Sequence, residues 1–179
     1  MFSPFFFQKI LNNKNSFGAV DFEFVHSWTN DVNLFQKDYV LIPLCMSEHW
    51  SLIIICYPGQ VALLGEKNMD GSTEVPCILH FDSIKGRHAD ARIEETIRRY
   101  LFDHWKVKEG VNEQENERIE NNFLSLKFSS LELPMQENSY DCGVFLLHYV
   151  EQFLELTSNR TTDFMEQLDQ NCEGNPTCR

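Results

Sequence analysis

The chain lacks the long apolar run that a membrane-spanning helix requires. Such a helix takes about 20 consecutive apolar residues, and no stretch of the 179 residues approaches that length, although 42% of them are hydrophobic. The start, MFSPFFFQKILNNKN, also lacks the basic segment, apolar segment and cleavage site of a secretory signal. The sequence therefore predicts a soluble protein with no membrane partner, whose length suits one domain with a sizeable core.

Basic residues are scarce relative to acidic ones. The chain has 15 Lys and Arg residues against 27 Asp and Glu residues, which gives a net charge of −12. Proteins that bind nucleic acid through bulk electrostatics need an excess of positive charge to neutralise phosphates. We therefore expect no nucleic-acid partner.

The cysteine spacing typical of a zinc site is missing as well. Of the six cysteines, Cys172 and Cys178 lie in a polar tail without a second spaced pair or a nearby histidine, so we expect no metal and no cofactor. Cys45, Cys56 and Cys77 fall inside apolar runs that are typical of core strands. Without a secretory signal, free thiols in a reducing compartment are favoured over disulfides.

The spacing of apolar residues predicts a mixed plan of helices and strands. We expect helices over 1–11, 91–105 and 142 to about 156, strands over 38–45, 50–57, 77–82 and 123–133, and a helix or irregular segment over 20–29. Residues 106–122 are charged and amide-rich, which favours a flexible insertion. The sequence thus predicts an α+β domain over residues 1–156 and a polar C-terminal tail over 157–179.

The most informative stretch is LPMQENSYDCGVFLLHY, in which a polar, turn-prone run reaches Cys142 and then becomes apolar. This change indicates a loop that enters a buried helix with Cys142 in its first turn. Unpaired backbone N–H groups and the helix dipole stabilise a thiolate there, which is the nucleophilic form. Gly143 leaves room for a substrate backbone, and the Gln136 amide can donate to an oxyanion. An ordinary core cysteine after a capped turn is the alternative.

A thiolate nucleophile needs a general base and a group that orients the base. His49 directly precedes the buried second strand, and Asp82 follows the third strand, so neighbouring strand ends can bring the two side chains together. His80 alternates with Asp82, points to the same face, and stays a rival base on spacing alone. His148, among apolar residues of the last helix, is more typical of a core histidine.

These motifs resemble a known family. His49-Trp50-x-Leu52, then Asp82, then Gln136-x-Asn138-x-x-Asp141-Cys142-Gly143 is similar to the ubiquitin-like-protein-specific cysteine proteases, that is, the SUMO proteases or sentrin-specific peptidases. The resemblance runs from about residue 28 to residue 153. The segments DYVLIPL, HWSLIIICYPG, CILHFDSIKG and SLELPMQENSYDCGVFLLHYVE are similar to the branch that trims SUMO chains, which includes plant members.

The resemblance implies a papain-like, adenoviral-protease-like fold, with a central sheet of about four to five strands packed against a buried helix that carries the nucleophile. It implies a catalytic triad of His49, Asp82 and Cys142, and an oxyanion hole made by Gln136 and the backbone N–H of Cys142. It also implies that Trp50 lies over the Gly-Gly end of the substrate. The implied reaction is thiol hydrolysis after the C-terminal Gly-Gly of SUMO, in conjugates or precursors.

Three other readings follow from the same residues. The chain could be a protease of this fold for another ubiquitin-like modifier, a cysteine acyltransferase, or an inactive relative that binds a ubiquitin-like protein without cleaving it. The last reading follows from both ends of the chain. The family's domains begin with a further segment that nothing here matches, and they continue beyond Phe153, so we expect a chain truncated at both ends. Nuclear or nucleocytoplasmic residence is an implication of the family alone.

Overall fold

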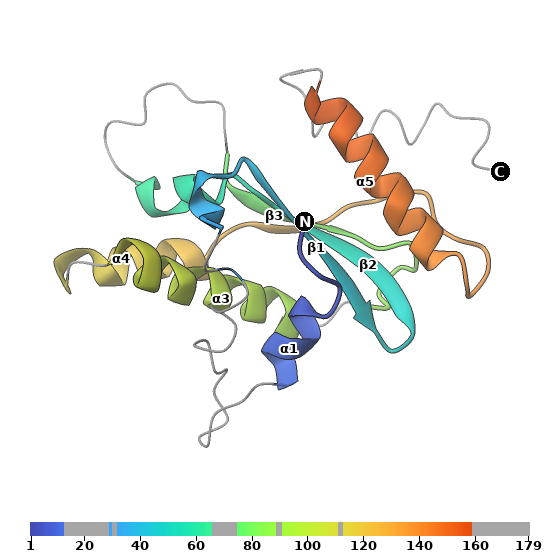
Figure 1. Cartoon of the computed structure of the whole chain (residues 1–179), viewed down its shortest axis with the longest axis horizontal. Helices are drawn as coiled ribbons and strands as arrows, with labels where there is room; N and C mark the ends of the chain where they lie inside the picture. Colours follow the sequence, from blue (N-terminus) through green and yellow to red (C-terminus); the bar gives the residue numbers. More distant parts are fainter. Residues whose placement is uncertain (13–28, 30–31, 66–74, 89–90, 111–112, 159–179) are drawn as a thin grey trace.

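The computed structural model describes residues 1–12, 29, 32–65, 75–88, 91–110 and 113–158. Figure 1 shows the helices and strands in these ranges. The expected segment 20–29 lies outside them except for Thr29, and so does the tail from residue 159 onward, with Cys172 and Cys178.

Four strands form one sheet in the order β1-β2-β3-β4. The strands are β1 (Tyr39–Met46), β2 (His49–Cys56), β3 (Cys77–Phe81) and β4 (Phe128–Ser130). The first three pair antiparallel, whereas β3 and β4 pair parallel. The predicted α+β class and the number of strands are therefore confirmed.

Alternating residues of the strands face two separate apolar cores. On one face, Ile42, Ile53 and Ile78 pack with α1 (Phe6–Asn12), α3 (Ala91–Glu109) and α4 (Glu113–Leu124). On the other face, Leu52 and Phe81 pack with α5 (Cys142–Ser158). Figure 1 shows α5 on the opposite side of the sheet from α1 and α3. Because both faces are covered, β2 is continuously apolar from Leu52 to Cys56, as expected of a strand buried on both faces.

Within the segment 106–122, the described residues 106–109 and 113–122 are helical, which corrects the expectation of a flexible insertion for these residues. The first of them continue α3, and the last ten belong to α4. Two side chains one helical turn apart, Ile119 and Phe123, enter the core, and Arg99 of α3 pairs with Glu120 of α4 at 3.0 Å. Two apolar anchors on one face suffice to dock a helix whose other side is charged. Because α4 extends to Leu124, β4 is confined to three residues of the predicted strand 123–133.

Helix α5 begins at Cys142, as predicted, and continues to Ser158. Its buried face carries Cys142, Leu146, Tyr149 and Phe153. The described residues cover only this face, since Val144, Leu147 and Leu154 are at least half exposed. Two short 3-10 helices, Leu34–Gln36 and Pro58–Leu63, are the remaining elements of the described residues. Among the described helices, none combines the length and apolar character needed to cross a bilayer.

Candidate active site

The β1–β2 hairpin places His49 through a tight two-residue turn. Met46 and His49 are paired residues at the end of the ladder, and Ser47 and Glu48 between them have φ angles of 50° and 60°. Two successive left-handed residues are the geometry of a type I′ turn, which matches the twist of a hairpin. His49 is therefore the first residue of β2, and it is 2% exposed.

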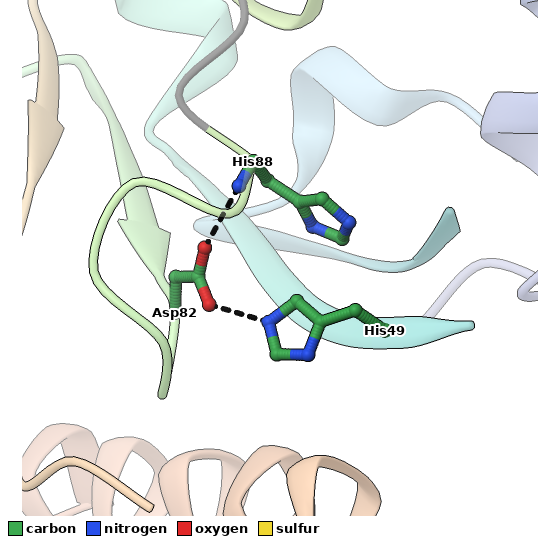
Figure 2. Close-up of side chains that lie close together, drawn as sticks. All are labelled: His49, Asp82 and His88. Atoms are coloured by element: carbon green, nitrogen blue, oxygen red, sulfur yellow. Dashed lines mark hydrogen bonds and ion pairs between the residues drawn. The ribbon is translucent and has the colours of Figure 1, made fainter. Parts of the chain in front are cut away.

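Asp82 directly follows β3 and contacts the imidazole of His49, as Figure 2 shows. The His49 Nε2 lies 2.6 Å from Asp82 Oδ1. The carboxylate also accepts the backbone N–H of Ile84 at 3.0 Å and the backbone N–H of His88 at 3.2 Å. Burial raises the pKa of Asp82, but the hydrogen bond from His49 and the two backbone donors outweigh burial, so the pKa is lowered overall.

This geometry fixes the role of each His49 ring nitrogen. A carboxylate only accepts hydrogen bonds, so Nε2 of His49 carries the proton and donates it to Asp82. Nδ1 is then the basic nitrogen that is available to a third group. The structure thus brings His49 and Asp82 together, as the sequence predicted from their places at neighbouring strand ends.

Cys142 is the first residue of α5 and is 4% exposed. Two observations place the start of α5 against the hairpin that carries His49. A Cβ atom at Gly143 would lie 4.0 Å from Cδ1 of Trp50. Burial raises the pKa of Cys45, the β1 partner of Trp50, and the nearby Cys142 raises it further. Trp50 is half-buried and lies beside Gly143, where the chain has no side chain to separate the indole from the helix.

The Gln136 side chain is oriented by two hydrogen bonds. Its Oε1 accepts the hydroxyl of Ser83 at 2.6 Å, and its Nε2 donates to the carbonyl of Asn138 at 2.6 Å. Its backbone N–H also donates to the carbonyl of Ser83 at 3.0 Å. A primary amide nitrogen has two hydrogens, and the bond to Asn138 uses one of them. The loop that precedes Cys142 is therefore attached to the residue that follows Asp82.

The polar run before α5 is held by its own side chains rather than by strands. Asn138 Oδ1 accepts the backbone N–H groups of Tyr140 and Asp141, both at 3.0 Å, and its Nδ2 donates to the Asp141 carboxylate at 2.6 Å. The hydroxyl of Tyr149 in α5 donates to the carbonyl of Pro134 at 2.8 Å. These bonds connect both ends of the loop to the helix that Cys142 begins.

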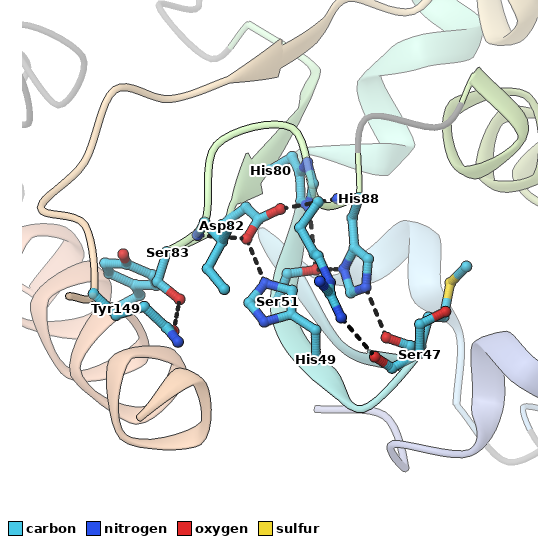
Figure 3. A network of polar contacts seen from close by, with 12 residues as sticks. Ser47, His49, Ser51, His80, Asp82, Ser83, His88 and Tyr149 are labelled. Carbon is cyan, nitrogen blue, oxygen red and sulfur yellow. Dashed lines mark hydrogen bonds and ion pairs between the residues drawn. The ribbon is translucent and has the colours of Figure 1, made fainter. Parts of the chain in front are cut away.

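His80 does not contact Asp82 as the base of a triad would. Its Nε2 lies 3.1 Å from the hydroxyl of Ser51, and Ser51 lies 2.8 Å from Nδ1 of His88. His80 and Ser51 share the face of the sheet that the alternation of β2 and β3 gives them. Figure 3 shows this network next to the His49–Asp82 pair. Burial lowers the pKa of His80 to about 4, so its imidazole is neutral near pH 7.

Sequence reasoning missed Ser51, Ser83 and His88. The side chain of Ser51 has its partner on β3, and the partner of Ser83 is in the loop before α5, so no local pattern reports either contact. His88 lies in a loop, where a histidine alone predicts nothing. The signal that was available was the position of Ser51, which the period of β2 places on the same face as His49.

His49, Asp82 and His88 also have the composition of a metal site, and their ligand atoms lie within 4.8 Å of one another. The hydrogen bonds argue against that use. Nε2 of His88 lies 3.0 Å from the carbonyl of Met46, which can only accept, so this nitrogen carries a proton. Nδ1 of His88 is occupied by Ser51. A metal would have to replace bonds that the ring already makes.

Comparison with known proteins identifies relatives over most of the chain. The probable ubiquitin-like-specific protease 2B of Arabidopsis thaliana is 44% identical over 158 residues, which cover 86% of this chain and 16% of that protein. Sentrin-specific protease 7 of Mus musculus is 30% identical over an alignment of 177 residues, covering 73% of this chain and 16% of that protein. The chain therefore spans about a sixth of the length of these curated relatives.

A solved structure described as a de-sumoylating protease has the same fold. It superposes with a TM-score of 0.64 at 26% identity, over 86% of this chain and 51% of that chain. This match confirms the fold that the resemblance implied, with a sheet packed against the helix that begins at the cysteine. Residues 1–173 match the Ulp1 protease family, C-terminal catalytic domain. The sequence match over nearly the whole chain, together with the shared fold, establishes that this chain belongs to the Ulp1 family of ubiquitin-like-protein-specific cysteine proteases.

Proposed function

We propose that this chain is a cysteine peptidase domain that cleaves after the C-terminal Gly-Gly of SUMO, in conjugates or precursors. The observation that carries the proposal is the His49–Asp82 pair at 2.6 Å, in which His49 begins β2 of a hairpin that packs against the helix beginning with Cys142. A carboxylate that orients an imidazole base, and a thiol that the base can deprotonate, are the groups needed for nucleophilic catalysis by a thiolate. The relatives named as ubiquitin-like-specific and sentrin-specific proteases support the choice of modifier.

The proposed reaction has two stages. Nδ1 of His49 takes the thiol proton, and the Cys142 sulfur attacks the carbonyl carbon of the last glycine. The tetrahedral intermediate collapses, the bond from this carbon to the lysine nitrogen breaks, and His49 returns its proton to the leaving amine. Water then attacks the thioester while His49 accepts one of its protons, and the thioester opens to a free carboxylate and the thiol. Asp82 stabilises the imidazolium form of His49 in both stages.

Gln136 and the backbone N–H of Cys142 are the proposed oxyanion donors. Ser83 and Asn138 supply what a preorganised donor needs, because they hold both ends of the Gln136 amide before any substrate is bound. The N–H of Cys142 belongs to the first turn of α5, where backbone donors have no partner within the helix.

Trp50 and Gly143 are the proposed substrate-binding residues. The indole lies against a position without a side chain, so the space between hairpin and helix is narrow at this point. A narrow passage next to the nucleophile accepts a glycine dipeptide and excludes residues with side chains. Selectivity for Gly-Gly would then come from steric exclusion.

The experiment uses the whole chain and SUMO that carries a C-terminal electrophile in place of the last carboxylate. We expect one covalent adduct, located at Cys142 by mass spectrometry and absent in the Cys142→Ala variant. Ubiquitin with the same electrophile is the matched control and should not react. Labelling by ubiquitin or another modifier instead of SUMO would show a protease of this fold with a different substrate. SUMO binding without an adduct would show an inactive relative and would refute catalysis.

A nuclear or nucleocytoplasmic location is part of the same proposal and rests on the family alone. Imaging of a fluorescent fusion of the whole chain tests it, and uniform exclusion from nuclei would refute it.

A further inference from the structure

The His88 imidazole ties the loop that carries Asp82 to the hairpin that carries His49. The loop runs from the end of β3 to His88, and the His88 side chain is buried, with 5% of the residue exposed. Its Nε2 lies 3.0 Å from the carbonyl of Met46, and its Nδ1 lies 2.8 Å from the hydroxyl of Ser51. Met46 is the cross-strand partner of His49, and Ser51 is two residues further along β2. Both anchors therefore flank His49.

The protons of this network can each be assigned. The carbonyl of Met46 only accepts, so Nε2 of His88 is protonated and its Nδ1 is an acceptor. Ser51 then donates its hydroxyl proton to His88 and accepts one from Nε2 of His80. Each donor has one acceptor, and the direction of the chain is fixed. Burial lowers the pKa values of His80 and His88, so both rings are neutral near pH 7, as the assignment requires.

The backbone of His88 completes the link to the carboxylate. Its N–H donates to Asp82 Oδ2 at 3.2 Å, while Oδ1 faces His49. The ring of His88 also lies next to that of His49, with centroids 4.8 Å apart. Figure 2 shows the carboxylate between the His88 backbone and the His49 ring. If His88 moved away from the hairpin, its backbone N–H would pull on Oδ2 of Asp82 or lose its hydrogen bond to that oxygen.

We propose that His88 is a positioning residue for the Asp82–His49 pair, with Ser51 and His80 as its support. The imidazole touches no reacting atom, and its role is to hold the distance and orientation in which Asp82 accepts the His49 proton. This inference rests on the proposed function, because it assigns His88 a part in the same catalysis. A charged partner held at a fixed distance stabilises the imidazolium form of His49 only while that geometry persists.

The test compares His88→Ala with His88→Gln. Glutamine offers an N–H donor for the Met46 carbonyl and an oxygen acceptor for the Ser51 hydroxyl, whereas alanine offers neither. On a SUMO conjugate, we expect His88→Ala to lower kcat by about tenfold, the effect of one hydrogen bond. KM should change by less than about threefold, and His88→Gln should recover most of the lost kcat. His148 lies on the exposed side of α5, which corrects the expectation of a core histidine, so His148→Gln is the matched control and should behave as wild type.

A second readout needs no protein substrate. Alkylation of Cys142 by iodoacetamide reports the fraction of thiolate, which a well-positioned imidazolium maintains at low pH. We expect His88→Ala to lower the ratio of the rate at pH 6.5 to the rate at pH 9 by about threefold or more. Unchanged ratios and unchanged kcat in His88→Ala would overturn the proposal. The wild-type protein could fail to cleave SUMO while its alkylation ratio still depends on His88. That result would refute the proposed substrate but would support the positioning role of His88.

A second variant, at a site other than His88 but with a similar loss of stability, distinguishes a positioning effect of His88 from a general effect on stability. Ile97→Val trims the core beneath α3, far along the chain from the hairpin, and should lower the unfolding temperature without changing kcat or the alkylation ratio. If Ile97→Val and His88→Ala reduce kcat equally at matched unfolding temperatures, His88 acts through stability only and the proposal is wrong.

Discussion

The replacement Asp82→Asn tests the proposed triad most directly, because the carboxylate accepts three hydrogen bonds and donates none. Oδ1 accepts from His49 Nε2 and from the Ile84 backbone, and Oδ2 accepts from the His88 backbone. Asparagine has the same shape but only one oxygen, and its nitrogen is a donor. Either orientation of the amide therefore places an N–H group against at least one N–H group that the carboxylate satisfied.

The two orientations have different consequences for catalysis. If the oxygen faces His49, the amide nitrogen meets the His88 N–H, and His49 keeps its tautomer but loses an anionic partner. If the nitrogen faces His49, it meets the Ile84 N–H, and Nε2 of His49 must become the acceptor. The His49 proton is then on Nδ1, so Nδ1 cannot accept the proton of the thiol. Each orientation retains two hydrogen bonds, so geometry alone does not favour one.

The expected loss of turnover follows from these two cases. A hydrogen bond to a charged group contributes about 1 to 2 kcal/mol more than a neutral one, which predicts at least about a tenfold loss in the first case. The wrong tautomer in serine proteases lowers kcat by about 10⁴-fold, which sets the loss in the second case. One unsatisfied buried donor should also lower the free energy of unfolding by about 1 to 3 kcal/mol.

The assay is single-turnover cleavage of a SUMO conjugate together with thermal unfolding of the same samples. Asp103→Asn is the matched control, because burial raises the pKa of this α3 carboxyl and it lies outside the site. Wild-type turnover in Asp82→Asn would refute the triad. The stability difference provides an internal check. Because the folded-state pKa of Asp82 is lowered, its ionised form stabilises the fold above about pH 4, so the difference should shrink as the pH falls below that value.

Three further predictions concern neighbouring groups. Gln136→Ala should slow turnover by on the order of a hundredfold, the typical effect of one oxyanion donor, and Ser83→Ala, which frees one end of the same amide, by about tenfold; unchanged kcat in both would remove Gln136 from the oxyanion hole. Replacing Ser47-Glu48 by Asn-Gly should raise the free energy of unfolding by about 1 kcal/mol in urea titrations, because both positions have positive φ. Stability should also fall between pH 6.5 and pH 4 by up to about 3 kcal/mol, because the folded pKa of His80 is about 4 and the unfolded chain binds the proton first. A flat pH profile that is the same in His80→Gln would contradict this last prediction.

The sequence predicted the parts of the fold that have a strong local pattern. Strands β1, β2 and β3 are mostly apolar runs, and α5 starts where the polar run ends, so their bounds agree with prediction to within a few residues. The sequence did not predict helix α4. This helix packs on the core through two side chains, Ile119 and Phe123, and its other residues have a composition typical of a flexible segment. The long β4 prediction failed for the same reason, since α4 takes the first residues of that segment.

For the candidate site, the sequence predicted the contact between His49 and Asp82 from their residue types and their places in the strands. His49 and Asp82 are at adjacent strand ends, and chemistry leaves few other reasons for that pair to meet. The support around them could not be predicted, because Ser51, His80 and His88 meet through three-dimensional proximity, not sequence spacing. A hydrogen bond between distant loops leaves no periodic pattern in either sequence segment.

The position of Cys142 relative to His49 depends on the smaller of the two cores. Helix α5 contacts the sheet through Leu146, Tyr149 and Phe153, which pack on the face formed by alternating residues of β2 and β3. The same packing brings Gly143 at the start of α5 against Trp50 of the hairpin that carries His49. Because the separation between α5 and the sheet is set by these buried side chains, a core residue such as Phe153, three turns beyond Cys142, takes part in setting the geometry of the site. The contacts of α5 with the sheet therefore hold the start of the helix, with Cys142, in place. This holds even though the opposite face of α5 is exposed.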